Sequence, residues 1–304
     1  MSSLNRIISG TYSGLTRNVF YILIGILSLP IYLSFWSLDL YATWILILTI
    51  VAILKIPISS YQEYLGNEFL KLGKRNKIEI AKILYGSAVI IFIYSVLLAF
   101  LIFFLLNFTN LLYFFKINQS LIDKASIVII ILFLAEIIDS IVSLFTRALY
   151  PFRYYPKINW TGLIVSVTIP VCQIFFVILG FQLVELSIAT FFIINFVSII
   201  WFIYFQKYIK KEKITYIKFD FLKNLNHLKN SFYLMIGNFS RMFKSEGVRL
   251  ILSPMLGTIQ MISYVTMKTA SNFIRQFFFS FINSLQIEFI DYINEKNKDK
   301  FLYS

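Results

Sequence analysis

Long apolar runs constrain the fold of this sequence more than any other feature. A helix that crosses a lipid bilayer needs about 20 mostly apolar residues, and runs of this kind recur along the chain. Of the 304 residues, 59% are hydrophobic and 14% are charged, whereas a soluble domain is about 45–50% apolar and about 25% charged. Inside lipid every backbone N–H and C=O group needs a partner, which a helix supplies within its own segment. The sequence therefore predicts an all-α, polytopic membrane protein.

We expect about eight transmembrane helices. Their predicted ranges are 18–36, 38–58, 83–106, 125–146, 160–180, 183–205, 231–252 and 259–285. Very short turns join the first helix to the second and the fifth to the sixth, so each of these pairs is predicted to form a helical hairpin. Residues 1–17 are polar, and no small-residue cleavage site follows the first apolar run, which predicts a retained helix rather than a cleaved signal peptide.

The Lys and Arg residues alternate between the connections. Twenty of them lie in the N-terminal segment, the second, fourth and sixth connections and the C-terminal tail, whereas the other connections hold only Lys116 and Lys124. Because cytoplasmic loops are enriched in Lys and Arg, we expect both termini to be cytoplasmic. The same loops account for the net charge of +13, so the sequence predicts no nucleic-acid binding.

A weak internal repeat predicts the domain organisation. Three identical pairs align at an offset of 224 residues, namely Ser60 with Ser284, Gln62 with Gln286 and Lys74 with Lys298. Six predicted helices separate the copies, and an even number makes this a parallel repeat. We expect a six-helix bundle at 1–205, a basic cytoplasmic loop at 206–230, and the first two helices of a second bundle with a cytoplasmic tail at 231–304. On this interpretation the chain ends four helices short of two full bundles.

Basic residues inside the last two predicted helices are candidates for substrate binding. They are Arg241, Lys244, Arg249, Lys268 and Arg275. At 100° per residue the first three fall within one arc of about 140°. A charge at a helix centre costs about 2.5–3.5 kcal/mol on insertion scales, so these side chains are expected to line a wet cavity. Arg and Lys bind phosphate oxygens, which predicts an anionic substrate.

Acidic residues in the predicted helices have two interpretations. Glu136 and Asp139 follow one stripe of the fourth helix, and Glu246 lies near the cationic arc of the seventh. They could bind a coupling proton or sodium ion, or they could pair with a cation on another helix and hold the bundle together. We expect Lys55 to extend its ammonium group to the cytoplasmic surface, and we expect the single histidine, His227, to be a solvated loop residue.

Several function classes find no support in the sequence. It contains no Walker motif, zinc signature or nucleophile elbow. The single cysteine, Cys172, allows no disulfide within the chain and no thiolate metal cluster. No predicted external loop is long enough for a large catalytic loop. We therefore expect neither an enzyme nor a protein with a metal or other cofactor.

Four stretches carry a resemblance to a known family. They are Thr16-Arg17-Asn18 before a first helix with Leu29-Pro30, then Asp39-Leu40-Tyr41-Ala42-Thr43-Trp44, then Gly66-Asn67-Glu68-Phe69-Leu70-Lys71-Leu72-Gly73-Lys74, and finally Leu256-Gly257 followed by Tyr264. In this layout the chain resembles the O-antigen and polysaccharide flippases of the multidrug/oligosaccharidyl-lipid/polysaccharide exporter superfamily. Ala42 departs from the pattern, because the family usually has Gly at that step.

The resemblance implies twelve helices in two bundles around a central cavity. It also implies alternating access that moves an undecaprenyl-pyrophosphate-linked oligosaccharide, such as an O-antigen or capsule repeat unit, across the bacterial inner membrane. The expected partners are that lipid-linked pyrophosphate, the lipid bilayer, a coupling proton or sodium ion, and other polysaccharide-assembly membrane proteins. Two alternatives stay open, namely a multidrug exporter of the same superfamily and a non-transporting fragment or assembly partner.

Overall fold

The structure is a computed structural model and describes residues 3–109, 111–257, 260, 262–265 and 267–268. Within these residues all regular elements are helical. The first seven are α1 (Ser3–Phe35), α2 (Leu38–Leu54), α3 (Ile56–Leu72), α4 (Lys77–Phe108), α5 (Leu111–Phe114), α6 (Gln119–Arg147) and the 3-10 turn η1 (Tyr150–Phe152). They are followed by α7 (Tyr155–Ile178), α8 (Leu183–Lys211), α9 (Phe221–Asn230), α10 (Phe232–Met242), the π-helical turn η2 (Phe243–Gly247) and α11 (Val248–Leu256).

The predicted all-α polytopic fold is confirmed. Among the described residues, α1 (from Tyr12), α4, α6, α7 and α8 are each long and apolar enough to cross a membrane. The helices α2 and α3 together form a sixth candidate span, bent by 45°. These elements correspond to the first six predicted helices. The seventh predicted range coincides with α10, η2 and α11, and the eighth lies almost entirely outside the described residues.

The bend between α2 and α3 corrects the predicted second helix, which ended at residue 58. Pro57 has no N–H group to donate to the carbonyl of Ile53, so the helical hydrogen bonds are interrupted there. Helical bonding resumes when the Ser59 N–H donates to the Lys55 carbonyl at 3.0 Å. The bent span then continues to Leu72. The polar stretch that the sequence placed in a cytoplasmic connection is therefore the second half of a candidate span.

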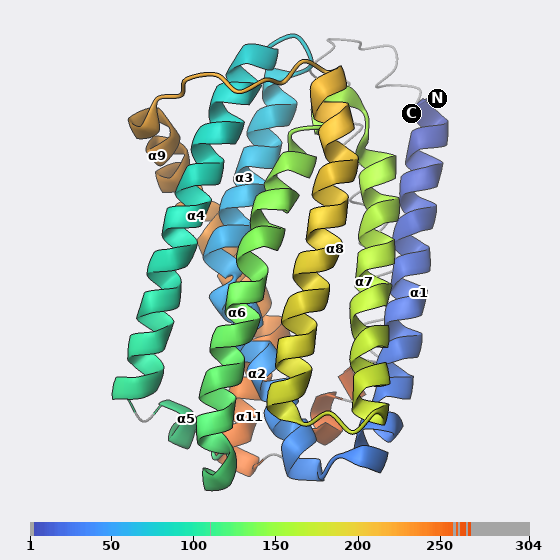
Figure 1. Cartoon of the computed structure of the whole chain (residues 1–304), viewed down its shortest axis with the longest axis vertical. Coiled ribbons are helices and arrows are strands. Elements are labelled where there is room, and N and C mark those ends of the chain that lie inside the picture. The colour runs from blue at the N-terminus through green and yellow to red at the C-terminus, as the bar shows by residue number, and fades with distance from the viewer. Residues whose placement is uncertain (1–2, 110, 258–259, 261, 266, 269–304) are drawn as a thin grey trace.

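The helices alternate in direction, so their connections gather at two ends of the bundle (Figure 1). The α3–α4, α6–α7 and α8–α9 connections lie at the end where α1 begins, at the top of the view. We call it the basic end, because the predicted Lys- and Arg-rich connections fall there. The α1–α2, α4–α6 and α7–α8 connections lie at the opposite end. This arrangement agrees with the alternation of basic residues along the sequence.

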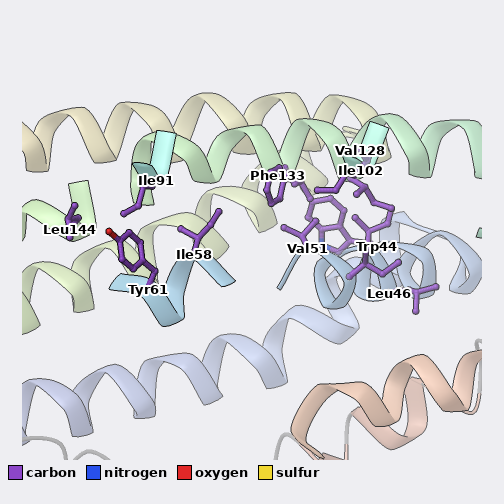
Figure 2. Close-up of a cluster of buried hydrophobic side chains, with 14 of the residues drawn as sticks. Trp44, Leu46, Val51, Ile58, Tyr61, Ile91, Ile102, Val128, Phe133 and Leu144 are labelled. Carbon is purple, nitrogen blue, oxygen red and sulfur yellow. The ribbon is translucent and has the colours of Figure 1, made fainter. Parts of the chain in front are cut away.

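Helix α6 is at the centre of the packing. It contacts α8, α4, α2 and α3, whereas α1 packs mainly against α7. Figure 2 shows Trp44 and Val51 of α2 close to Ile102 of α4 and to Val128 and Phe133 of α6, and all five side chains are buried. The outward faces of the helices carry exposed large apolar side chains, as expected of a surface that contacts lipid tails.

The segment from α10 to α11 runs along the bent span. Helix α10 packs against α3, and α11 contacts α2. The hydroxyl of Ser253 on α11 donates to the Phe115 carbonyl at 2.7 Å, just after α5. With 11 and 9 residues, α10 and α11 are each shorter than a spanning helix. The seventh predicted helix is thus a composite of two short helices joined by a π-helical turn.

Helix α9 is a short helix that docks on the side of the bundle near the basic end. It packs against α4 and α3. Its Asn224 is 2% exposed and lies against Gly86 of α4, where an ideal Cβ atom would come within 2.6 Å of the Asn224 Cγ. Ser87 donates to the Asn224 side-chain oxygen at 3.2 Å, and the Tyr61 hydroxyl lies 3.3 Å from its backbone carbonyl. The segment 206–230, predicted as a loop, is therefore partly helical and fixed to the bundle.

Candidate functional site

A partly buried ion pair lies at the bend between α2 and α3. The Lys55 ammonium group pairs with the Glu136 carboxylate on α6, and their side chains are 32% and 17% exposed. Lys55 stands between two helices of 17 residues each, so the pair lies near mid-height of the bent span. The expectation that Lys55 reaches the cytoplasmic surface is wrong. Either end of the bent span is about 25 Å from Lys55 at 1.5 Å per residue, whereas Glu136 is within reach.

Asp139 lies almost one helical turn after Glu136 and faces α8 instead. Its Oδ1 accepts a hydrogen bond from the buried Ser198 hydroxyl on α8 at 3.0 Å. On the other side of α6, the Gln62 amide of α3 donates to the Ser140 carbonyl at 2.6 Å. The predicted acidic stripe thus contacts the bent span and α8 through polar groups. Of the two interpretations of Glu136, the structure shows the pairing with a cation, and a role in ion coupling stays a prediction.

A second polar cluster joins α10 to α3. The Asn238 amide donates to the Ser60 hydroxyl at 3.0 Å and to the Glu63 carboxylate at 2.9 Å. The Arg241 guanidinium donates to the Asn238 side-chain oxygen. Asn238 thereby connects a predicted cavity cation to an acidic residue on the bent span.

Of the four residues in this cluster, the sequence analysis predicted only Arg241 as a site residue and missed Ser60, Glu63 and Asn238. Ser60 and Glu63 stood in a stretch assigned to a connection, and Asn238 is uncharged. The available signal was spacing: Ser60 and Glu63, like Asn238 and Arg241, are three residues apart and so share a helix face.

The π-helical turn η2 separates the predicted cavity cations. Arg249 on α11 donates to the Thr49 hydroxyl of α2 at 3.4 Å, whereas Lys244 lies in η2 with its side chain exposed. Because a π-helix bonds residues five apart rather than four, the 100° step that predicted one shared arc does not apply across η2. Arg249 therefore contacts α2 directly, whereas Arg241 is linked to α3 only through Asn238.

Lys268 lies beyond α11. Its Nζ is buried, is 5.2 Å from the centre of the Tyr264 ring, and makes no hydrogen bond within the part of the chain that the structure describes. This contact is a cation–π interaction. Arg275 and the side chain of Glu246 lie outside what the structure describes.

His227 does not occupy a solvated loop, and that expectation is wrong. It lies in α9 with its ring centre 5.9 Å from that of Tyr64 on α3. Both ring nitrogens are buried and, among the described residues, make no hydrogen bond. Burial lowers the pKa of His227, because the charged imidazolium loses its hydration. The neutral ring is therefore the form that packs between α9 and α3.

The carboxylates inside the bundle contact groups on neighbouring helices. Among the described residues, no three His, Cys, Asp or Glu side chains are grouped so as to hold a metal ion. The carboxylates of Glu63, Glu136 and Asp139 instead accept hydrogen bonds or an ion pair from α10, α2 and α8. Such contacts couple the charge of a carboxylate to the packing of its neighbouring helices.

Comparison with known proteins finds a solved structure with a similar fold but no matching sequence family. No protein-family model matches the chain, and no curated protein sequence matches it significantly. Among solved structures, the chain is similar to a crystal structure of the eukaryotic MATE transporter AtDTX14, with a TM-score of 0.70 and 11% sequence identity. The match covers 96% of this chain and 66% of that chain, so this chain spans slightly less than two thirds of that transporter's length. At this identity the similarity shows the fold.

Proposed function

We propose that a chain with this transporter fold is a membrane exporter of the multidrug/oligosaccharidyl-lipid/polysaccharide superfamily. The observation that carries the proposal is the match to a MATE transporter over 96% of the chain. The all-helical bundle with five or six candidate spans among its described residues agrees with it. A transporter fold also favours translocation over catalysis.

We infer further that the substrate is an undecaprenyl-pyrophosphate-linked oligosaccharide, an O-antigen or capsule repeat unit. The support is the charge of the segment after α9, where Arg241, Lys244, Arg249 and Lys268 lie. A buried cation in a membrane needs an anionic partner or water, and the Lys268 ammonium contacts the Tyr264 ring but makes no hydrogen bond to a described residue. Pyrophosphate oxygens would supply that partner, while the prenyl tail would remain in lipid.

Alternating access would use the bend at Lys55. Broken helices in transporters place charged groups at mid-membrane and allow the two halves to move separately. Here the bend carries the Lys55–Glu136 pair, and Asp139 lies one turn away on α6. We propose that these carboxylates, with Glu246, couple transport to a proton or sodium gradient. The N-terminal bundle would be residues 1–205, with both chain ends in the bacterial cytoplasm and the spans in the inner membrane.

The test of the substrate is a binding measurement. Arg241→Gln/Lys244→Gln/Lys268→Gln should weaken binding of undecaprenyl pyrophosphate to the purified chain at least tenfold, because three charge-assisted contacts are lost. The matched control is Lys210→Gln/Lys211→Gln/Lys218→Gln, which removes three exposed cations near the basic end and should leave binding within about twofold. We call the Arg241/Lys244/Lys268 variant the cavity triple variant. If it bound undecaprenyl pyrophosphate as tightly as the wild type, the substrate assignment would be refuted.

The multidrug-exporter alternative has its own supporting observation. The carboxylates of Glu63, Glu136 and Asp139 lie on α3 and α6, where they could attract a cationic drug. On that hypothesis Glu63→Gln should abolish efflux of a cationic dye from cells, and the cavity triple variant should not. A chain that transports neither substrate in a flippase-null strain would favour the third possibility, an assembly partner of other polysaccharide-assembly membrane proteins.

A further inference from the structure

Two lysines meet at the basic end of the helical hairpin formed by α7 and α8, which lie side by side (Figure 1). Lys157 is in the first turn of α7, and Lys207 is about one turn before the end of α8. The Lys157 ammonium group donates to the Tyr208 hydroxyl at 3.2 Å and lies 4.8 Å from the centre of its ring. The Lys207 ammonium group lies 5.0 Å from the centre of the same ring. The two cations are therefore neighbours, and we call them the hairpin lysine pair.

Aromatic rings hold the hairpin lysine pair in place. Lys157 also lies 5.8 Å from the centre of the Tyr154 ring, and Lys207 lies 4.2 Å from that of the Tyr204 ring. The Tyr204 and Tyr208 hydroxyl groups are 3.2 Å apart, which joins these two side chains of α8. Cation–π contacts of this kind attract an ammonium group to a ring but leave its positive charge in place. The tyrosines thus position the two charges without neutralising them.

The carboxylate at the end of α8 does not neutralise the pair. Glu212 pairs through Oε2 with the Lys77 ammonium group at 3.2 Å, and its Oε1 accepts from the Tyr154 hydroxyl at 2.9 Å. Among the described residues, no ion pair includes Lys157 or Lys207. An ammonium group has three N–H donors, and the described contacts of Lys157 use one of them in a hydrogen bond. An anion can therefore bind both lysines without displacing a carboxylate.

Exposed isoleucines continue the two helix faces away from the lysines. Ile164 is seven residues after Lys157, and Ile200 is seven residues before Lys207. Seven residues are almost two helical turns, so each isoleucine shares the face of its lysine at a distance of about 10 Å. Ile203, one turn from Lys207, is exposed as well. On both helices a charged group is thus followed by an apolar strip.

Two hydrogen bonds across the hairpin bring these strips to the same height. One is the bond from Lys157 to Tyr208, and in the other the Gln173 amide donates to the Thr190 hydroxyl at 3.3 Å. Because α7 and α8 are antiparallel, these bonds fix a register in which the exposed isoleucines of the two helices are level. Tyr and Lys side chains above an apolar surface are typical of the membrane–water interface. The hairpin therefore combines two cations at headgroup level with an apolar surface that suits an acyl chain.

We propose that the hairpin lysine pair binds the phosphate group of an anionic phospholipid, with an acyl chain along the exposed isoleucines. Lys157 and Lys207 supply charged donors for the phosphate oxygens, and their flexible stems allow both to turn towards one anion. The apolar strips favour a lipid over free phosphate, because only a lipid contacts the lysines and the isoleucines together. This site is separate from the transport substrate of the proposed function, and its test uses no transport measurement.

The experiment measures lipid binding by the purified full chain in neutral detergent. Native mass spectrometry titrates phosphatidylglycerol and, in parallel, phosphatidylcholine, whose headgroup has no net charge. We expect the wild type to prefer phosphatidylglycerol, and Lys157→Gln/Lys207→Gln to weaken that binding about tenfold. The matched control, Lys218→Gln/Lys229→Gln, removes two exposed cations in and next to α9, which docks on α3 and α4, and should change the affinity less than about twofold.

A conservative variant separates loss of charge from loss of structure. Lys157→Arg/Lys207→Arg keeps both charges and the ring contacts, so it should bind phosphatidylglycerol within about threefold of the wild type. If it bound as weakly as the Gln variant, the loss of charge would not be the cause and the proposal would be overturned. Equal losses in the Gln variant and in the control would overturn it too, because binding would then follow net charge alone.

A competition arm distinguishes the lipid from free phosphate. Inorganic phosphate, compared with chloride at matched ionic strength, should leave phosphatidylglycerol bound to the wild type. Displacement of the lipid by phosphate alone would indicate a site for soluble anions and would overturn the proposed ligand. Equal wild-type affinities for phosphatidylglycerol and phosphatidylcholine would also contradict the proposal, since the two lysines would then make no contact that depends on headgroup charge.

Discussion

Replacing Gly86 with Ala should release α9 from the bundle. The new Cβ atom would overlap the Asn224 side chain, which cannot turn aside freely. Its amide nitrogen donates to the Asp220 carbonyl at 2.8 Å, and its oxygen accepts from Ser87 at 3.2 Å. To make room, the side chain must break both bonds or α9 must move away from α4.

The magnitude follows from these contacts. One or two hydrogen bonds at about 1 kcal/mol each are lost. The gain in helix propensity from Gly to Ala does not offset this loss, because α4 is helical whether α9 is docked or not. The cost to docking is therefore about 1–2 kcal/mol, which raises the undocked fraction about five- to thirtyfold. Only the attachment of α9 is affected, because Asn224 is the contact that the new methyl group meets.

Hydrogen exchange across residues 221–230, measured by mass spectrometry, is the assay. The matched control is Gly162→Ala, since Gly162 lies in α7 and an added Cβ there would meet nothing within 4 Å. We expect faster exchange of α9 in the Gly86 variant and unchanged exchange in the control. In an Asn224→Ala background the Gly86 substitution should cost nothing further. Equal protection of α9 in the wild type and Gly86→Ala would refute the reasoning.

Three further predictions concern the bend and α9. Glu136→Gln should lower the free energy of unfolding by about 1–3 kcal/mol. This is less than for a fully buried ion pair, because the Lys55 side chain is one-third exposed. Thermal unfolding in detergent measures the change. Pro57→Ala should restore a helical hydrogen bond and reduce the 45° bend, which distances between spin labels on α2 and α3 report. Burial lowers the pKa of His227, so docking of α9 should be complete above about pH 6.5, the unfolded value, and should weaken as the pH falls towards the lowered pKa. His227→Phe should remove this dependence, because the buried ring nitrogens make no described hydrogen bond that Phe would lose.

Each of these three predictions has a control variant or a result that would contradict it. Lys55→Met in the Glu136→Gln background should recover part of the lost stability, since no unpaired charge remains. A Pro57→Ala variant with unchanged label distances would show that tertiary packing, and not the missing N–H group, sets the bend. For His227, the ratio of wild-type to His227→Phe exchange at each pH cancels the intrinsic rates, and a flat ratio between pH 5 and pH 7.5 would contradict the titration.

The sequence predicts the spans better than it predicts their partners. The long apolar runs of α4, α6, α7 and α8 are visible because each contains a stretch of high mean hydropathy with few charged residues. The second half of the bent span is hidden, because Ser60, Gln62 and Glu63 make it look like a connection. Their polar groups are matched by the Ser140 carbonyl and by Asn238, and such matches depend on tertiary packing.

In the candidate site too, the sequence predicts which residues share a helix face but not what they contact. Periodicity on α6 indicates that Glu136 and Asp139 share a stripe, but it cannot tell which cation or hydroxyl group is opposite each of them. The arc of cations on the seventh predicted helix assumed an unbroken α-helix, and η2 interrupts it between Arg241 and Arg249. Nothing in the local sequence marks a π-helical turn as clearly as a proline marks the bend.

The Lys55–Glu136 pair also sets an order for the synthesis of this protein. The two residues are 81 positions apart, and the ribosome adds about 5–20 residues per second. Lys55 is thus made roughly 4–16 s before its counter-ion. During that interval the second span carries an ammonium group at mid-membrane without its partner on α6. We therefore expect the insertion machinery to keep this span beside protein or water until α6 is made, and we expect the first four spans to enter lipid together rather than one by one.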